Sequence, residues 1–500
     1  MLFNTYAFLL LFLPVTLAGW FAFGKWAGLR AAQVWLAAAS LFFYAWWNPW
    51  YLGLIVFSMV GNFGWGRALA ARAAANQPRG LLFGLGVTAN LLALGYYKYA
   101  NFFVNNINVL FHAGWTLEKV ILPLAISFFT FQQIAYLADC TRGLAKEASF
   151  PTYALFVTFF PHLIAGPIVH HQEMMPQFAR PDVTRLRWDN LALGATLFTF
   201  GLAKKVLLAD PLGAQAGPVF HAAAAGGNLT MGAAWAGALA YPLQIYFDFS
   251  GYTDMALGLG RLFNIVLPQN FNSPYQAVNL VEFWRRWHMT LSRFLRDYLY
   301  IPLGGNRHGR LRQRLNLVIT MFLGGLWHGA GWTFIAWGLL HGVGLVLNHA
   351  WLESKTKLRA LGVVPKFLRL TAAHALTFSV ITLAWVLFRA DSFSAAVRLY
   401  ESLGGGGVAG GGASLSAPGS GWWAWLVILY LWNWFAPNSQ DVLSRWQPAL
   451  GVNETSRHAG LLGGRLLWQP AALWAVLTGV IFAVCFLSLS NASEFLYYKF

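Results

Sequence analysis

Apolar segments long enough to cross a membrane alternate with short basic stretches along the chain. The first covers residues 2–23, and three more follow before residue 98. A helix needs roughly 20 apolar residues to cross the hydrocarbon core of a bilayer. Lys25, Arg30 and Arg72 lie in the stretches between these segments, and such basic residues gather in cytoplasmic loops. The pattern predicts transmembrane helices and an N-terminus on the periplasmic side.

The same alternation continues through the middle and the end of the chain. Further apolar segments cover residues 118–138, 150–168, 190–208, 231–249, 250–266, 370–388, 421–436 and 470–490. Lys204 and Lys205 stand at the end of one segment and predict another cytoplasmic boundary. We therefore expect an all-α polytopic membrane protein, with roughly 11–14 embedded helices around a central cavity and some of them broken or re-entrant. Residues 1–500 are expected to form a single membrane-embedded domain.

An arginine-dense segment interrupts the apolar pattern. Between residues 285 and 314 there are eight arginines and one acidic residue, Asp297. A helix that faces lipid cannot carry this charge, so the segment must lie at a membrane surface. Apolar residues recur at helical spacing on one face of residues 282–314, and this face includes His288. We predict an amphipathic basic helix and loop that points His288 inward, and a simple packing role for this histidine is the alternative.

A segment without charged residues follows the arginines. Residues 315–347 contain no Asp, Glu, Lys or Arg, and this length exceeds one membrane span but falls short of two. Four glycines within residues 324–331 supply a break, so we predict a broken or re-entrant hairpin over residues 315–349. His328 lies at the break, and an ionisable group at that depth is expected to be functional. The alternative is a structural histidine bonded to a neighbouring carbonyl.

Composition narrows the class of protein. Of the 500 residues 58% are hydrophobic and 10% are charged, whereas about a quarter of a soluble protein is charged. The formal net charge of +17 comes from lysines and arginines in short loops, which indicates contact with anionic lipids and not with nucleic acid. Cys140 and Cys485 lie far apart without ligand-like neighbours, so neither a metal site nor a disulfide framework is expected.

Eight motifs carry a resemblance to a known family. They cover residues 160–167, 246–255, 270–275, 283–288, 295–306, 324–330, 388–391 and 495–500. In type and order they resemble the membrane-bound O-acyltransferase family, in its bacterial branch, and the likeness extends over nearly the whole chain. It implies a multi-pass O-acetyltransferase of the bacterial inner membrane. Such an enzyme takes acetyl from a cytoplasmic donor, acetyl-CoA or another acyl thioester, and passes it across the membrane to acetylate an exopolysaccharide such as alginate or cellulose.

Two inward histidines beside a basic surface suit acyl transfer to a hydroxyl. Imidazole titrates near neutral pH and can take the proton of the attacking alcohol, so His328 is the predicted catalytic residue and His288 its supporting partner. Arginine binds phosphate in a bidentate manner and can hold an anionic donor, although topology and lipid contact alone are the alternative role. The residues expected to bind substrate are Arg285, Arg286, Trp287, Arg296, Asn306, Trp327 and Asp248. No bound cofactor or metal is expected.

The resemblance also implies partners. Bacterial relatives act with periplasmic acetylation proteins and a polysaccharide pathway, and a flexible glycine-rich loop at residues 404–421 is expected on that side. Two other functions stay open. One is a proton-coupled transporter or channel in which the histidines relay protons, and the other is a non-catalytic scaffold of a polysaccharide secretion complex. The chain shows no internal repeat, which many transporters have.

Overall fold

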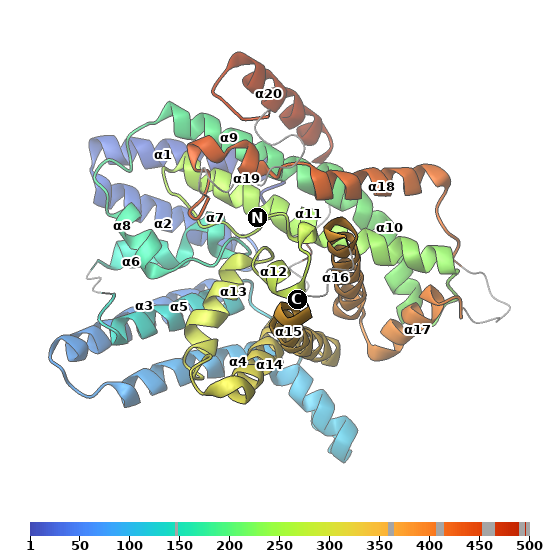
Figure 1. The fold of residues 1–500 in the computed structure, drawn as a ribbon. Helices are drawn as coiled ribbons and strands as arrows, with labels where there is room; N and C mark the ends of the chain where they lie inside the picture. Colours follow the sequence, from blue (N-terminus) through green and yellow to red (C-terminus); the bar gives the residue numbers. More distant parts are fainter. Residues whose placement is uncertain (146–148, 359–364, 407–414, 453–465, 490–495, 497–500) are drawn as a thin grey trace.

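The computed structural model shows a helical protein arranged around one long central helix, α11 (Figure 1). It describes residues 1–145, 149–358, 365–406, 415–452, 466–489 and 496. Among these residues there is no β-strand, and six helical runs are long and apolar enough to cross a membrane. The predicted class, an all-α polytopic membrane protein, is confirmed, while the total of 11–14 embedded helices stays a prediction.

Four consecutive helices form the N-terminal part. They are α1 (Leu13–Trp26, preceded by the π-helical η1 at Phe8–Phe12), α2 (Leu29–Ala45), α3 (Trp50–Ala74) and α4 (Gly80–Phe111). The α1–α2 and α3–α4 connections, which adjoin the basic residues Lys25, Arg30 and Arg72, lie on the same side of the molecule (Figure 1, left). The first residues of the chain and the α2–α3 connection therefore lie at the other end of these helices.

The central helix is buried along nearly its whole length. It is α11 (Met231–Leu262), which packs against α9 (Trp188–Ala203) and α10 (Asp210–Ala224), two helices joined by η2 (Lys204–Ala209). A Cβ atom at Gly258 of α11 would lie 2.6 Å from the Gly194 carbonyl oxygen of α9, so glycine allows the two backbones to meet. The two predicted segments 231–249 and 250–266 are one helix, because neighbouring helices surround its polar residues.

Lys204 and Lys205 form ion pairs inside this helical assembly. Lys204 pairs with Asp254 of α11 at 2.6 Å. Lys205 pairs with Asp248 at 2.7 Å and with Asp210 at 2.8 Å. Each charge is compensated by an opposite charge in contact, which allows burial. The predicted cytoplasmic boundary at these lysines stays a prediction, and the structure adds that both lysines belong to an internal ion-pair cluster.

Short helices connect the long ones and surround the histidines. They are α5 (Ile126–Thr141), α6 (Phe150–Thr158), α7 (Phe160–Leu163), α8 (His171–Phe178), η3 (Pro274–Gln276), α12 (Leu280–Trp284), α13 (Met289–Leu295) and η4 (Arg296–Tyr300). Most of their side chains are buried, so this part of the chain forms the interior next to α11.

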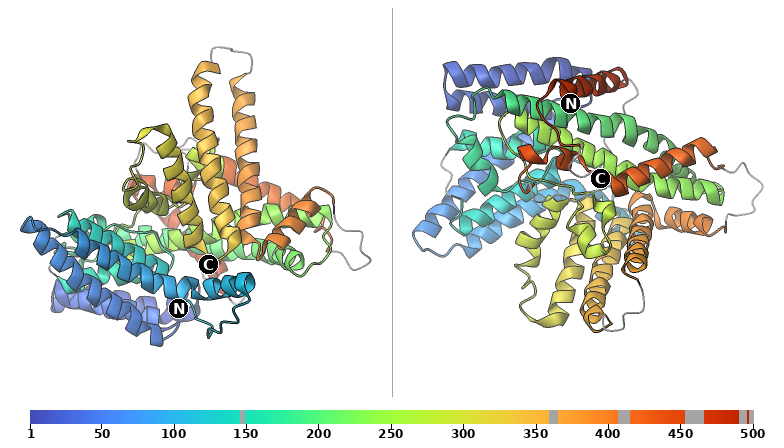
Figure 2. Two further views of the ribbon diagram at one scale, coloured as in Figure 1. Left: turned by 90° about the horizontal axis from the view of Figure 1, so that it is seen from below. Right: turned by 45° about the horizontal axis from the view of Figure 1, so that its top comes forward.

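The predicted hairpin is present, with helices longer than expected. α14 (Gly309–His328) and α15 (Trp332–Leu358) pack against each other, and α15 continues alongside α16 (Lys366–Arg389). Figure 2 shows α15 and α16 as a pair that projects from the rest of the protein. Both hairpin helices extend beyond residues 315–349 because each continues into a basic end. A Cβ atom at Gly325 would lie 2.4 Å from the Phe334 carbonyl oxygen, so the glycines do bring the two backbones together.

The C-terminal part consists of α17 (Phe393–Leu403), α18 (Ser420–Phe435), α19 (Ser439–Val442), η6 (Ser444–Trp446) and α20 (Ala472–Leu487). Of these, α17 and α18 pack on the central helix, and α20 packs on α9. Of the predicted glycine-rich loop 404–421, residues 407–414 lie outside the described residues. The helix ends that flank it lie on the side opposite the basic α1–α2 and α3–α4 connections (Figure 1, right).

Candidate active site

The basic segment that carries His288 is broken at this residue. α12 ends at Trp284 and α13 begins at Met289, so the expected helix within residues 282–314 is divided. His288 adopts φ 42°, in the left-handed region that residues with a Cβ atom rarely occupy. Its side chain is fully buried, as its inward direction predicted. A continuous helix was the wrong expectation because periodicity does not reveal the contacts that hold this break.

Asn270 holds the ring of His288 and determines its tautomer. Asn270 Oδ1 lies 3.0 Å from His288 Nδ1, and it accepts from the Thr290 hydroxyl at 2.8 Å and the Thr290 backbone N–H at 3.3 Å. A backbone N–H can only donate, so this atom of Asn270 is an acceptor and His288 Nδ1 must carry the hydrogen. Nε2 then bears the lone pair of the neutral imidazole, which is the form that can accept a proton.

His328 is the last residue of α14 and is held by aromatic rings. Its imidazole packs edge-on against Trp337 of α15 and Phe388 of α16, with ring centroids 5.2 Å and 5.3 Å away. Gly329 follows it, and a Cβ atom there would lie 2.2 Å from the Phe334 ring. A side chain at position 329 would therefore displace the Phe334 ring that packs against the end of α14.

Trp327 joins the two histidines. The centroid of its ring lies 6.2 Å from that of His288 and 5.0 Å from that of His328. His288 lies in the break between α12 and α13 and His328 at the end of α14, 40 positions further along the sequence, and both contact this indole. The predicted proximity of His288 and His328 is thus supported by their shared neighbour.

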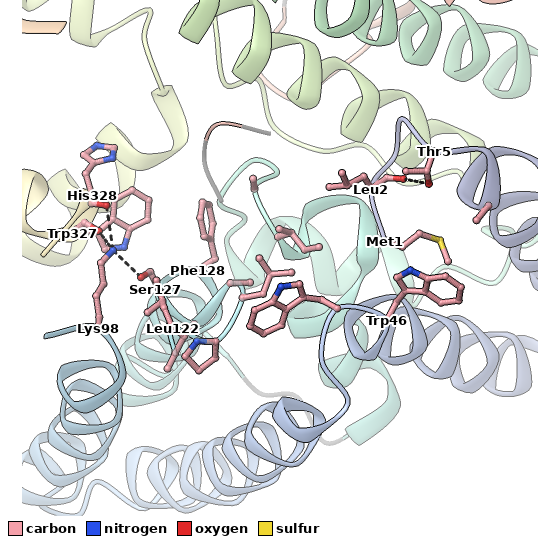
Figure 3. A pocket seen from close by; sticks show the side chains of 18 residues that line it. Met1, Leu2, Thr5, Trp46, Lys98, Leu122, Ser127, Phe128, Trp327 and His328 are labelled. Atoms are coloured by element: carbon pink, nitrogen blue, oxygen red, sulfur yellow. Dashed lines mark hydrogen bonds between the residues drawn. The ribbon is translucent and has the colours of Figure 1, made fainter. Parts of the chain in front are cut away.

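A cavity of about 630 Å³ reaches His328, and we call it the His328 cavity. Lys98, Ser127, Trp327 and His328 lie together at one end of it, and Met1, Leu2, Thr5 and Trp46 lie at the other (Figure 3). These outer residues belong to the start of the chain and to the α2–α3 connection. The cavity therefore extends toward the end of the N-terminal helices that is remote from their basic connections.

A second cavity, of about 610 Å³, lies beside the arginine-dense segment and is called the arginine cavity here. Of the arginines predicted to bind substrate, Arg285 and Arg296 line it, and so does Arg293. Hydrogen bonds from Arg296 to Asp297, at 2.7 Å and 3.2 Å, raise the pKa of this guanidinium, so its charge is retained. Thr290, which contacts Asn270 beside His288, also lines this cavity.

An apolar cluster with an aromatic stack inside it touches both cavities. Phe131 stacks on Phe294 with centroids 4.4 Å apart and on Trp327 with centroids 5.5 Å apart. In the same apolar cluster, Phe128 and Trp327 line the His328 cavity, while Leu295 lines the arginine cavity. We expected one central cavity. Two cavities lie here instead, and side chains of this apolar cluster form part of the wall of each.

The other predicted substrate-binding residues lie elsewhere. Arg286 is in an ion pair with Glu282 at 2.7 Å, and Asp248 is in the Lys205 ion pair. Trp287 is buried and packs against Trp385, at 4.9 Å between centroids, while Asn306 is exposed in a turn. None of these four residues lines either cavity, and their predicted role in binding substrate stays a prediction. Among the described residues, no group of metal-binding side chains could hold an ion.

Two features of the site were missed from the sequence. The motif at residues 270–275 carried the resemblance, but no role was assigned to Asn270. Lys98 was treated only as the end of an apolar segment, although its side chain is buried beside His328. A lysine at the end of a long apolar helix was a usable signal, since an ionisable group within a membrane segment is expected to have a function.

Comparison with known proteins agrees with this geometry. A model of the MBOAT, or membrane-bound O-acyltransferase, family matches residues 124–357, which include both histidines. The chain is 45% identical over 432 residues to a peptidoglycan O-acetyltransferase of Helicobacter pylori, covering 81% of this chain and 80% of that protein. It is 42% identical over 410 residues to a probable alginate O-acetylase of Pseudomonas aeruginosa, covering 81% of this chain and 75% of that protein.

A more distant relative carries a different name. The chain is 32% identical over 244 residues to a teichoic acid D-alanyltransferase of Streptococcus thermophilus, covering 46% of this chain and 58% of that protein. The high identity over most of the two O-acetylating relatives identifies this protein as a membrane acyltransferase, a member of the membrane-bound O-acyltransferase family.

Proposed function

We propose that this protein transfers acetyl groups from a cytoplasmic thioester, acetyl-CoA or another acyl thioester, to a hydroxyl acceptor on the periplasmic side of the bacterial inner membrane. The acceptor belongs to a pathway that O-acetylates a polysaccharide, such as alginate, cellulose or peptidoglycan. The observation that carries the proposal is the meeting of His288 and His328 on Trp327, next to two cavities of different character.

The reaction is a direct transfer in which His328 acts as general base. Its imidazole takes the proton of the acceptor hydroxyl while the oxygen attacks the thioester carbonyl carbon. The new C–O ester bond forms, the C–S bond breaks, and the departing sulfur receives the proton from the imidazolium. His288 supports this exchange through Nε2, because its Nδ1–H is committed to Asn270. No net proton is consumed.

The two cavities supply the two substrates from opposite directions. Arg285, Arg293 and Arg296 line one cavity, and guanidinium groups favour the anionic phosphates of a donor such as acetyl-CoA. His328 lines the other cavity, which extends away from the basic helix connections and thus toward the predicted periplasmic side. The thioester must reach past the stack of Phe131, Phe294 and Trp327, so these rings have to move during turnover.

The same arrangement of cavities and basic residues suggests where partners would bind. Periplasmic acetylation proteins would receive the acetyl group or present the glycan at the His328 cavity, whose outer end includes Trp46 and Trp47. Anionic lipids would surround the basic surface. Membership of an acyltransferase family favours this function over a transporter, a channel or a non-catalytic scaffold, which would use the same histidines for proton relay or not at all.

The test is His328→Ala in the full chain, expressed with its natural partners in cells that lack the native copy. Ester-linked acetate on the isolated glycan should fall to background, while the membrane abundance of the protein is unchanged. His221→Ala, at an exposed position of α10, is the control and should acetylate normally. Near-normal acetylation by His328→Ala would refute the proposal.

A further inference from the structure

The end of α14 is held by two residues of another helix. The last carbonyl groups of a helix lack partners within the helix and have to be satisfied from outside. The Gly325 carbonyl accepts from the Gly329 N–H at 3.4 Å. The next carbonyl, of Leu326, accepts from the Tyr99 hydroxyl of α4 at 2.7 Å.

The side chain of Lys98 contacts the two remaining carbonyl groups, those of Trp327 and His328. Its ammonium group donates to the Trp327 carbonyl oxygen and lies 3.5 Å from the His328 carbonyl oxygen. The Ser127 hydroxyl of α5 is its third partner, at 3.4 Å. The ammonium also lies 5.8 Å from the centroid of the Trp327 ring. Figure 3 shows this cluster at the inner end of the His328 cavity.

The C-terminal end of α14 favours a positively charged side chain at position 98. The Lys98 side chain is buried, and no carboxylate lies within ion-pair distance of it among the described residues. Burying an unpaired cation is costly, so its partners must compensate for the loss of water. The C-terminal end of a helix carries partial negative charge on its carbonyl groups, and a cation there is stabilising.

We propose that Lys98 and Tyr99 form a clamp on α4 that fixes the end of α14, and that Lys98 is a positioning residue for His328. The Lys98 contacts are to backbone atoms of Trp327 and His328, so the clamp determines where the imidazole lies without touching the reacting atoms. The part of the inference that concerns turnover rests on the function proposed above. The part that concerns the position of residue 328 does not.

The geometric part is tested by chemical labelling. His328→Cys places a thiol at the end of α14, and the two natural cysteines, Cys140 and Cys485, are buried. The rate at which a small methanethiosulfonate reagent modifies this thiol in membranes is compared with and without Lys98→Met. The clamp predicts that Lys98→Met changes the rate severalfold and that Lys98→Arg, which keeps the charge and the donors, changes it much less. Equal rates in all three proteins would overturn the clamp.

The functional part is tested with His328 intact. A displacement of about 1 Å can cost roughly 100-fold in rate, so Lys98→Met should lower the maximal acetylation rate by roughly 10- to 100-fold. The donor concentration for half-maximal rate should change little, because the arginine cavity is untouched. Lys98→Arg should restore most of the rate, and Lys119→Met, at an exposed position, is the control. A change confined to the half-maximal donor concentration would overturn the positioning role.

A milder variant covers the case in which Lys98→Met does not accumulate. Tyr99→Phe removes only one hydroxyl, and it should change the labelling rate and the acetylation rate in the same direction by a smaller factor. No change in either rate would overturn the clamp. Different results would refute the clamp and the catalytic role of His328. Altered labelling combined with normal acetylation in His328→Ala would leave the clamp standing and refute the catalytic role of His328.

Discussion

The two histidines of the site are held in different ways. His288 is fixed through its ring, by Asn270 and a backbone break, in a fully buried position. His328 is fixed through its backbone, by the clamp on the end of α14, while aromatic rings surround its imidazole and a cavity reaches it. A hydrogen bond to a ring nitrogen fixes which nitrogen of the imidazole carries the proton, whereas packing fixes only where the ring lies. The comparison indicates that hydrogen bonding fixes the tautomer of His288, whereas packing places His328 at the wall of a cavity.

The largest effect is expected when the ring of His288 is removed without disturbing the backbone. Asparagine tolerates the left-handed region better than alanine does, so His288→Asn should accumulate at least as well as His288→Ala. Loss of a general acid–base group costs roughly 100-fold or more, and we expect that loss in the initial rate of glycan acetylation. If both variants were inactive only because they failed to accumulate, His288 would have a packing role.

A smaller effect is expected at Asn270, which acts through His288. Asn270→Leu removes the acceptor for Nδ1–H, so the ring can rotate or change tautomer, and the acetylation rate should fall by roughly tenfold. Asn270→Asp keeps an acceptor oxygen and should retain more of the rate than Asn270→Leu does. The measurement is the rate at saturating donor, together with membrane abundance. Equal loss in the two variants would contradict the tautomer assignment.

The smallest effect is expected at the arginine cavity, because we propose that its side chains bind donor and do not take part in the chemistry. Arg285→Gln and Arg296→Gln should each raise the donor concentration for half-maximal rate severalfold, up to roughly tenfold, with the maximal rate unchanged. Arg307→Gln is the matched control, since Arg307 belongs to the same basic segment but is exposed outside this cavity. The assignment fails if Arg307→Gln has the same effect as the other two.

Asp248 and Lys98 show what the sequence can and cannot predict about charged residues in apolar surroundings. Both were visible as ionisable groups within long apolar segments. The sequence could not distinguish the ion pair of Asp248 with Lys205 from a contact with substrate. It also could not show that Lys98 meets the carbonyl groups of residues 327 and 328, because more than 200 positions separate the partners. Burial is readable from hydropathy, but the partner of a buried charge is set by how distant helices pack.

The sequence alone determined the helical membrane class, the hairpin and the inward direction of both histidines. These properties follow from local patterns, namely apolar length, the position of glycines and the spacing of arginines, which act within one or two helical turns. The other features of the site depend on how distant segments of the chain pack together. The break at His288 depends on Asn270, the end of α14 depends on Lys98 and Tyr99, and the aromatic stack beside the site depends on the contacts of Phe131 with Phe294 and Trp327. Each of these contacts joins segments that are distant in the sequence, and no local pattern records such a pairing.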